Sequence, residues 1–239
     1  MRIRSWYVLA FLGILFFIGM AQECLADVAI EQVVKDKDGR PSKVLIYYSE
    51  DRFRSDRPEV GMTTIIDFKG DRMMMIDHRS KNYVDVPFAR WEKEVAERLK
   101  KSAPRTKTKP RKITVQKTGE TQVINGFQTE KILVYGNGEL IEENWTTRDV
   151  EMKEVEKVME KVAKGFSKDF KLEMMEGREI YEKLKPHGYP ILVKDHSRTY
   201  GLGGLEVLEV KKLEKKELGD DVFLPPADYN KIIPEPYKK

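Results

Sequence analysis

Cysteine is nearly absent from this chain of 239 residues, which contains Cys24 and no other. The segment after it therefore has no internal disulfide, no thiolate zinc site and no cysteine nucleophile. Histidine is scarce too, and His78, His187 and His196 show no metal-ligand spacing. A zinc site would need carboxylates that no pattern singles out, so we predict no metal.

Long apolar runs are also missing, except for one between Trp6 and Met20. Arg2 and Arg4 precede this run, and small residues follow it up to Ala26, which is the pattern of a signal peptide cleaved after Ala26. The run is shorter than the ~20 apolar residues that a membrane span needs. We expect export to the periplasm; a retained membrane anchor is the alternative.

Removal of residues 1–26 as a signal peptide leaves residues 27–239, which are long enough to bury the core of a single domain. An exported chain that has no disulfides is typical of the bacterial envelope and depends on that core alone. A lipoprotein signal is disfavoured because the charged Glu23 adjoins Cys24.

A strong excess of one charge is absent, since the formal net charge is +4 while 35% of residues are charged. We therefore expect no nucleic-acid partner. No serine lies in a Gly-x-Ser-x-Gly motif, and the adjacent Glu142 and Glu143 would point to opposite faces of a strand. We predict no catalytic residues, no cofactor and no enzymatic activity.

Short segments rich in Val, Ile, Tyr, Thr and Met, separated by turn residues, predict strands. They are Val28–Lys35, Ser42–Ser49, Met62–Phe68, Arg72–Asp77, Asn82–Val86, Lys112–Lys117, Thr121–Asn125, Thr129–Tyr135, Leu140–Thr147, Pro190–Thr199 and Leu205–Leu213. Asn125-Gly126 and Asn137-Gly138 are hairpin turn signals. The run Met73-Met74-Met75-Ile76 is apolar at every position, which predicts a strand covered on both faces.

Two segments show helical periodicity, Phe88–Lys101 and Glu151–Phe170. The second carries one apolar stripe, which consists of Val155, Val158, Met159, Val162 and Phe166. Ser167 and Gly177 predict breaks or bends in the helical region that follows. Strands joined by hairpin-length connections, with helices between groups of strands, predict an α+β fold: a large, mostly antiparallel sheet with helices packed on one face.

Several blocks of this sequence carry a resemblance to a known family. They are Ile46-Tyr47-Tyr48, Arg52-Phe53-Arg54, Thr64-Ile65-Ile66-Asp67-Phe68, Met73-Met74-Met75-Ile76-Asp77, Lys81-Asn82-Tyr83, Gly188-Tyr189-Pro190 and Phe223-Leu224-Pro225-Pro226-Ala227-Asp228-Tyr229. With them the chain resembles an uncharacterised family of exported bacterial proteins related to the lipoprotein-carrier superfamily of LolA, LolB and LppX type. The resemblance covers most of residues 28–230. It implies an unclosed β-barrel, a half-barrel with helices packed on its concave face. No functional residue of the carriers is matched by a motif here.

Methionines occur on neighbouring predicted strands and in the helical region, and methionine suits adaptable apolar surfaces. An ordinary packed core is the alternative interpretation. We predict a hydrophobic ligand cavity between sheet and helices, with the helix as a lid. Its predicted lining is Ile66, Phe68, Met74, Ile76, Ile132 and Val134 from strands, with Val155, Val158, Met159, Val162 and Phe166 from the helix.

Residues 98–112 carry eight Lys or Arg side chains and no acid, and Pro104 and Pro110 predict a loop. Such a loop favours transient contact with anionic lipid headgroups; a solvated linker is the alternative. Together these patterns predict a non-catalytic envelope protein that binds a lipid or another hydrophobic ligand, as a carrier does. The alternative function is an envelope protein-interaction or structural module whose barrel is filled by its own side chains, with a protein partner that the sequence does not name.

Overall fold

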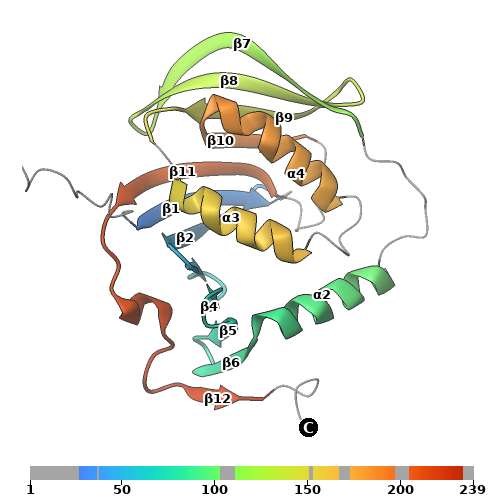
Figure 1. Ribbon diagram of the computed structural model, residues 1–239. Coiled ribbons are helices and arrows are strands. Elements are labelled where there is room, and N and C mark those ends of the chain that lie inside the picture. Colours follow the sequence, from blue (N-terminus) through green and yellow to red (C-terminus); the bar gives the residue numbers. More distant parts are fainter. Residues whose placement is uncertain are drawn as a thin grey trace, which may run out of the picture.

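One large open sheet dominates the computed structural model, which describes residues 27–36, 38–102, 111–150, 153–166, 173–196 and 205–233. Within these ranges twelve strands form the sheet, with β12 at one edge and β7 at the other (Figure 1). The predicted signal peptide, residues 1–26, lies outside the described ranges. The described part contains no helix that is both long and apolar enough to cross a membrane.

The sheet consists of two meanders. In chain order the strands are β1 (Val28–Asp36), β2 (Pro41–Ser49), β3 (Arg52–Arg57), β4 (Met62–Asp67), β5 (Arg72–Asp77), β6 (Asn82–Pro87), β7 (Ile113–Ile124), β8 (Phe127–Gly136), β9 (Glu139–Thr147), β10 (Tyr189–Asp195), β11 (Leu205–Lys215) and β12 (Asn230–Ile232). Strands β1–β6 lie side by side in sequence order, as do β7–β11, and β1 pairs with β11 to join the two groups. All pairs are antiparallel except β12 with β6.

A large, mostly antiparallel, open sheet is therefore confirmed. Both Asn-Gly hairpins are confirmed as well: Asn125 and Asn137 have φ of 49° and 54°, and the glycine after each has φ of 89°. Positive φ at both central positions is what a type I′ turn requires. The sequence patterns missed β3 and β12, and they divided β7 into two strands where a bulge between Lys117 and Thr121 interrupts the pairing.

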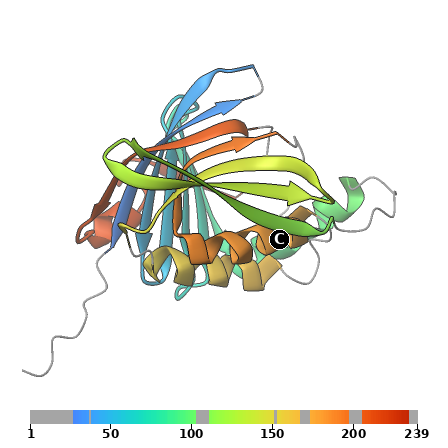
Figure 2. The same cartoon turned by 90° about the horizontal axis from the view of Figure 1, so that it is seen from above.

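Three helices lie on the same side of the sheet: α2 (Phe88–Ser102), α3 (Lys153–Phe166) and α4 (Glu173–Leu184) (Figure 2). Two short 3₁₀ turns also lie in the described ranges: η1 (Lys185–His187) and η2 (Asp220–Phe223). Gly177, where we predicted a break or a bend, lies inside α4 and does not end the helix.

The predicted loop at residues 98–112 begins later than expected, because α2 continues through Ser102. Residues 103–110 of that loop lie outside the described ranges, and the structure resumes at Arg111.

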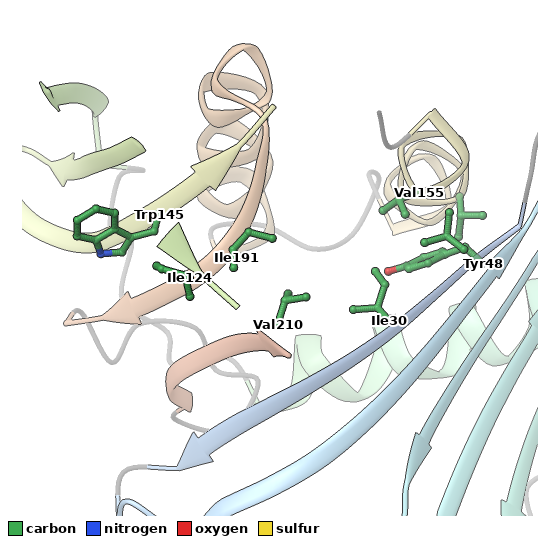
Figure 3. Close-up of a cluster of buried hydrophobic side chains, with 9 residues drawn as sticks. Ile30, Tyr48, Ile124, Trp145, Val155, Ile191 and Val210 are labelled. Atoms are coloured by element: carbon green, nitrogen blue, oxygen red, sulfur yellow. The ribbon is translucent and has the colours of Figure 1, made fainter. Parts of the chain in front are cut away.

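Helix α3 packs on the strands where the two meanders meet. Val155 and Val158 of α3 share one buried cluster with Val28 and Ile30 of β1 and Tyr48 of β2. Figure 3 shows Val155 directed from the helix toward Tyr48, with Ile30 below. Val158 is fully buried in this cluster. The side chains of Met159, Val162 and Phe166 lie outside the described ones.

Strand β5 packs against other side chains on both of its faces, as its apolar run predicts. On the helix-side face, the face that carries Phe53, Ile66 and Met73, helix α2 contributes Phe88 and Trp91. On the outer face, a different cluster forms from strand residues and from the chain segment 216–232, which we call the C-terminal strap. Its members are Ile65, Met74, Ile76, Leu218 and Phe223, with Tyr47, Tyr83, Val222 and Tyr229 around them.

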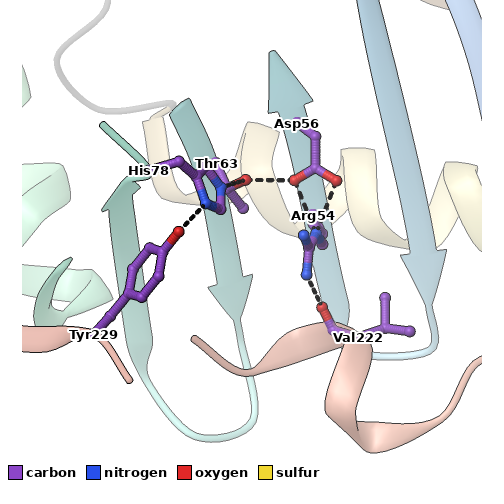
Figure 4. Close-up of polar contacts among 6 residues, drawn as sticks. All are labelled: Arg54, Asp56, Thr63, His78, Val222 and Tyr229. Carbon is purple, nitrogen blue, oxygen red and sulfur yellow. Dashed lines mark hydrogen bonds and ion pairs between the residues drawn. The ribbon is translucent and has the colours of Figure 1, made fainter. Parts of the chain in front are cut away.

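A chain of polar contacts fixes the strap to the outer face (Figure 4). Arg54 pairs with Asp56 at 2.9 Å and also donates to the Val222 carbonyl oxygen. Thr63 Oγ1 donates to Asp56 at 2.6 Å and lies 2.8 Å from His78 Nε2, and His78 Nδ1 is 2.9 Å from the Tyr229 hydroxyl. Because the Thr63 proton goes to Asp56, His78 Nε2 must donate to Thr63. Both ring nitrogens of His78 therefore have partners.

Candidate functional site

The helix-side face of β2–β6 is not covered along its whole length. Near the β2–β3 turn, α3 holds the strands: Lys161 pairs with Asp51 and donates to the Glu50 carbonyl oxygen at 3.3 Å. Farther from this turn, one row of half-exposed side chains runs across the strands. The row consists of Ile46, Ser55, Thr64, Met75 and Val84, one from each of strands β2 to β6.

A hollow of about 490 Å³ lies on this face over β3 and β4. It is partly open, and its volume falls within the range of ~300–1,000 Å³ typical of small-molecule sites. Its lining comes from β3, β4 and the turn between them: Phe53, Ser55, Arg57, Val60, Met62 and Thr64. Val60 and Met62 remain 48% and 36% exposed, which is unusual for such apolar side chains in a small region.

Polarity changes along the hollow. Phe53, Ser55 and Arg57 alternate along β3 and so share one face. Phe53 packs on Tyr48 with ring centroids 5.4 Å apart, at the inner end. Ser55 and Thr64 are directly paired across β3 and β4, which places two hydroxyl-bearing residues side by side in the middle. Arg57 is exposed at the outer end.

Two acidic residues, Glu59 and Asp77, lie near the outer end of the hollow, and both already accept hydrogen bonds. The Glu59 carboxylate accepts the Lys43 backbone N–H at 2.8 Å. Asp77 lies opposite Met62, and hydrogen bonds from the Ser80 hydroxyl and the Arg79 backbone hold the pKa of Asp77 below its ordinary value. Among the described residues, the Arg57 side chain makes no hydrogen bond or ion pair. The hollow therefore presents one uncommitted cation beside apolar side chains.

None of the eight predicted cavity residues with described side chains lines this hollow. The structure distributes them among four buried clusters. Ile132 and Val134 pack against Ile180 and Leu184 of α4. Val155 and Val158 belong to the cluster under α3, and Ile66 and Phe68 belong to the cluster beneath α2.

Met74 and Ile76 are separated from the others by the sheet itself. Met74 pairs with Ile65, so both side chains point to the outer face, while the neighbouring Ile66 points to the helix-side face. Leu218 and Phe223 of the C-terminal strap cover Met74 and Ile76. We expected Met74 and Ile76 to share one cavity surface with Ile66 and the helix stripe. The register shows that this is wrong, because Met74 and Ile66 lie on opposite faces of the sheet.

The residues that line the hollow were not predicted, because the pattern of β3 was not recognised as that of a strand. Charged Arg52, Arg54 and Asp56 occupy its outer face, so the segment reads as polar. The usable signal was the alternation of Phe53 with these charged residues. In the described ranges, no group of three His, Cys, Asp or Glu side chains is arranged to hold a metal ion.

An open, mainly antiparallel sheet with few helices and a partly open hollow defines the structural class as α+β with mostly β structure. A family model described as "Domain of unknown function (DUF4412)" matches residues 43–229. This chain belongs to that family, which agrees with its resemblance to an uncharacterised family. None of the curated proteins matches the sequence.

Similar solved structures share little sequence with this chain. The crystal structure of an uncharacterized conserved protein from Thermus thermophilus is 10% identical, with a TM-score of 0.46, and the match covers 93% of this chain and 98% of that one. MucB is 9% identical with a TM-score of 0.41, covering 86% of this chain and 59% of MucB. PNGF-II is 12% identical with a TM-score of 0.36, covering 89% and 32%. At these TM-scores the likenesses carry no functional inference, so the proposals below rest on this chain's own residues.

Proposed function

We propose that this protein is an exported, non-catalytic envelope protein that binds a lipid or another apolar ligand on the helix-side face of its sheet. The observation that carries the proposal is the hollow over β3 and β4, where Phe53, Val60 and Met62 leave apolar surface accessible. Transfer of an acyl chain from water onto such a surface contributes about 0.8 kcal/mol per buried methylene. In this proposal the open sheet acts as a half-barrel whose concave side holds the ligand.

The other parts of the proposal extend the same function. Export would follow from the signal peptide expected at residues 1–26, with a periplasmic location. The basic segment 98–112 would make transient contact with anionic headgroups while the ligand is loaded or released. A carrier of this kind needs neither a metal nor a cofactor.

The polar network on the outer face supports a non-catalytic role. Thr63 is 1% exposed, and its hydroxyl is shared between Asp56 and His78. A nucleophile must reach its substrate, and these side chains are occupied with fixing the strap.

One observation favours a protein-interaction or structural module instead. The interior beneath α3 and α4 is filled by the protein's own side chains, with Val158, Ile132 and Val134 fully buried. A filled interior at these positions is what the self-filled barrel predicts, and the hollow would then be a surface depression.

Binding of the neutral fluorescent probe N-phenyl-1-naphthylamine separates the two functions. Thr64→Phe places a large side chain on the floor of the hollow, and we expect it to weaken probe binding at least about tenfold. Thr114→Phe is the matched control, because Thr114 is exposed on the edge strand β7, away from the hollow. If the folded wild-type protein binds no probe, or if both variants bind it like wild type, the ligand-binding function is rejected in favour of the interaction module.

A further inference from the structure

The order of side chains along the hollow indicates which kind of apolar ligand it takes. Phe53 and Arg57 lie four residues apart on one face of β3, a separation of ~13 Å along the strand. The inner end is aromatic and packed, the middle carries the Ser55 and Thr64 pair, and the outer end carries a guanidinium. A wholly apolar ligand would make no use of this gradient.

We infer that the hollow takes a single-chain amphiphile with an acidic headgroup, whose alkyl chain lies towards Phe53 and whose headgroup binds Arg57. This inference rests on the proposed function, because it assigns the ligand class of the same hollow. Guanidinium donors match a carboxylate or a phosphate in a forked geometry, which makes Arg57 a suitable partner for either acid.

Arg57 is the one charged side chain in the lining of the hollow, which favours an acidic headgroup at the outer end. The carboxylates of Glu59 and Asp77 are engaged by backbone N–H groups, as described above. A second cation, Arg79, lies along the β3–β4 turn and donates to the Glu59 carbonyl oxygen at 2.9 Å. Glu59 and Asp77 keep their negative charge, but neither belongs to the lining of the hollow, where a headgroup would meet Arg57.

The middle of the hollow fits the same orientation. Ser55 and Thr64 are half-buried and directly opposed, and their hydroxyls donate and accept. These hydroxyls can hydrogen-bond the polar end of a ligand next to the headgroup. Phe53 and its neighbour Tyr48 offer apolar contact at the inner end of the hollow. The single lining cation, Arg57, corresponds to one acid group.

Displacement of N-phenyl-1-naphthylamine by ligands with the same alkyl chain tests the headgroup. At neutral pH and low salt we expect dodecanoate and dodecyl phosphate to bind about fivefold more tightly than dodecanol, since an exposed ion pair contributes up to about that factor. Dodecyltrimethylammonium should bind most weakly. The stronger of the two acids identifies the source as a fatty acid or a phosphate lipid, and either supports the inference.

Arg57→Gln should remove the preference for acids while dodecanol binding stays unchanged, and Arg57→Lys should retain part of it. Arg178→Gln, on the exposed surface of α4, should behave as wild type. Equal binding of acid and alcohol by wild type, or an acid preference that survives Arg57→Gln, overturns the headgroup assignment and leaves the proposed function standing. Failure of dodecanol and both acids to displace the probe overturns the proposed function itself.

Discussion

Glu176 holds Arg111 at two places. Its Oε1 accepts the Arg111 backbone N–H at 2.8 Å, and its Oε2 accepts Nη2 of the same residue at 2.8 Å and Nε at 3.0 Å. Through this carboxylate, α4 is fixed to the chain just before β7, which begins at Ile113. The Glu176 side chain is only 6% exposed, so the two charges interact in a poorly hydrated environment.

Glu176→Gln should therefore lower the free energy of unfolding by about 2–3 kcal/mol, because the partly buried Arg111 guanidinium loses the charge of Glu176. Chemical denaturation followed by circular dichroism measures this change. Glu179→Gln, on the same helix, is the matched control: Glu179 pairs with Lys183 at a half-exposed position, so its loss should cost less than about 0.5 kcal/mol. Equal effects of the two substitutions would contradict the role assigned to Glu176.

The same pair should make stability depend on pH. Burial would raise the pKa of Glu176, but the hydrogen bonds and charge of Arg111 outweigh it and hold the pKa below its ordinary value. An unfolded glutamate titrates near about 4.3. The stabilisation is therefore complete above that pH and is lost as the pH falls through the lower, folded pKa. The difference in stability between wild type and Glu176→Gln should shrink below about pH 4; stability curves that stay parallel in acid would refute this.

Val158→Asp tests the packing of α3 on the sheet. Val158 is fully buried among β1 and β2 side chains, so an aspartate there has no partner and should destabilise the protein by at least about 3 kcal/mol. The exposed Lys157, one residue earlier, provides the control, and Lys157→Asp should change stability by about 0.5 kcal/mol or less. Thermal melts that coincide for the two variants would show that α3 does not depend on this contact.

The C-terminal strap offers a matched pair of neighbours. Phe223 is 3% exposed and packs on the outer face, whereas Leu224 is 50% exposed. Phe223→Ala should cost about 3–4 kcal/mol from lost burial and the cavity left behind, and Leu224→Ala about 0.5 kcal/mol or less. Urea unfolding distinguishes them, and a small effect of Phe223→Ala would mean that the strap is dispensable for the sheet.

Export is tested by N-terminal sequencing of the protein recovered from the periplasm of an expressing bacterium. We expect the chain to begin at Asp27, because small residues precede the predicted cleavage after Ala26. A protein that still carries Trp6–Met20, or one lipidated on Cys24, would replace the periplasmic location with a membrane-bound one.

The sequence predicted the sheet well where local chemistry determines it. Asn125-Gly126 and Asn137-Gly138 turn as expected because only a few residue types tolerate positive φ. The stripe with Val155 and Val158 follows from helical periodicity alone. Glu142 and Glu143 also diverge as expected: Glu142 accepts from Asn144 in the interior, and Glu143 meets His196 on the other face.

The candidate site was not predictable in the same way. In β5 both faces are apolar, so alternation separates Met74 from Met73 without saying which of them faces the helices. What decides it is coverage by Phe223, which lies far along the chain, and no local pattern reports such a partner. The hollow, likewise, is defined by the helices leaving Ser55 and Thr64 uncovered, which is a property of packing.

The pairing of β1 with β11 has a consequence for how the chain assembles. Strands β1 to β6 are joined by short hairpins, so their contacts are local and can form as soon as each hairpin is complete. Val28 meets Lys215 at the seam, and no partner for that edge of β1 exists until almost the whole chain is present. Until then, the bare edge of β1 is open to pairing with other chains. The seam is thus a joint that joins the two meanders only once β11, near the end of the chain, is present.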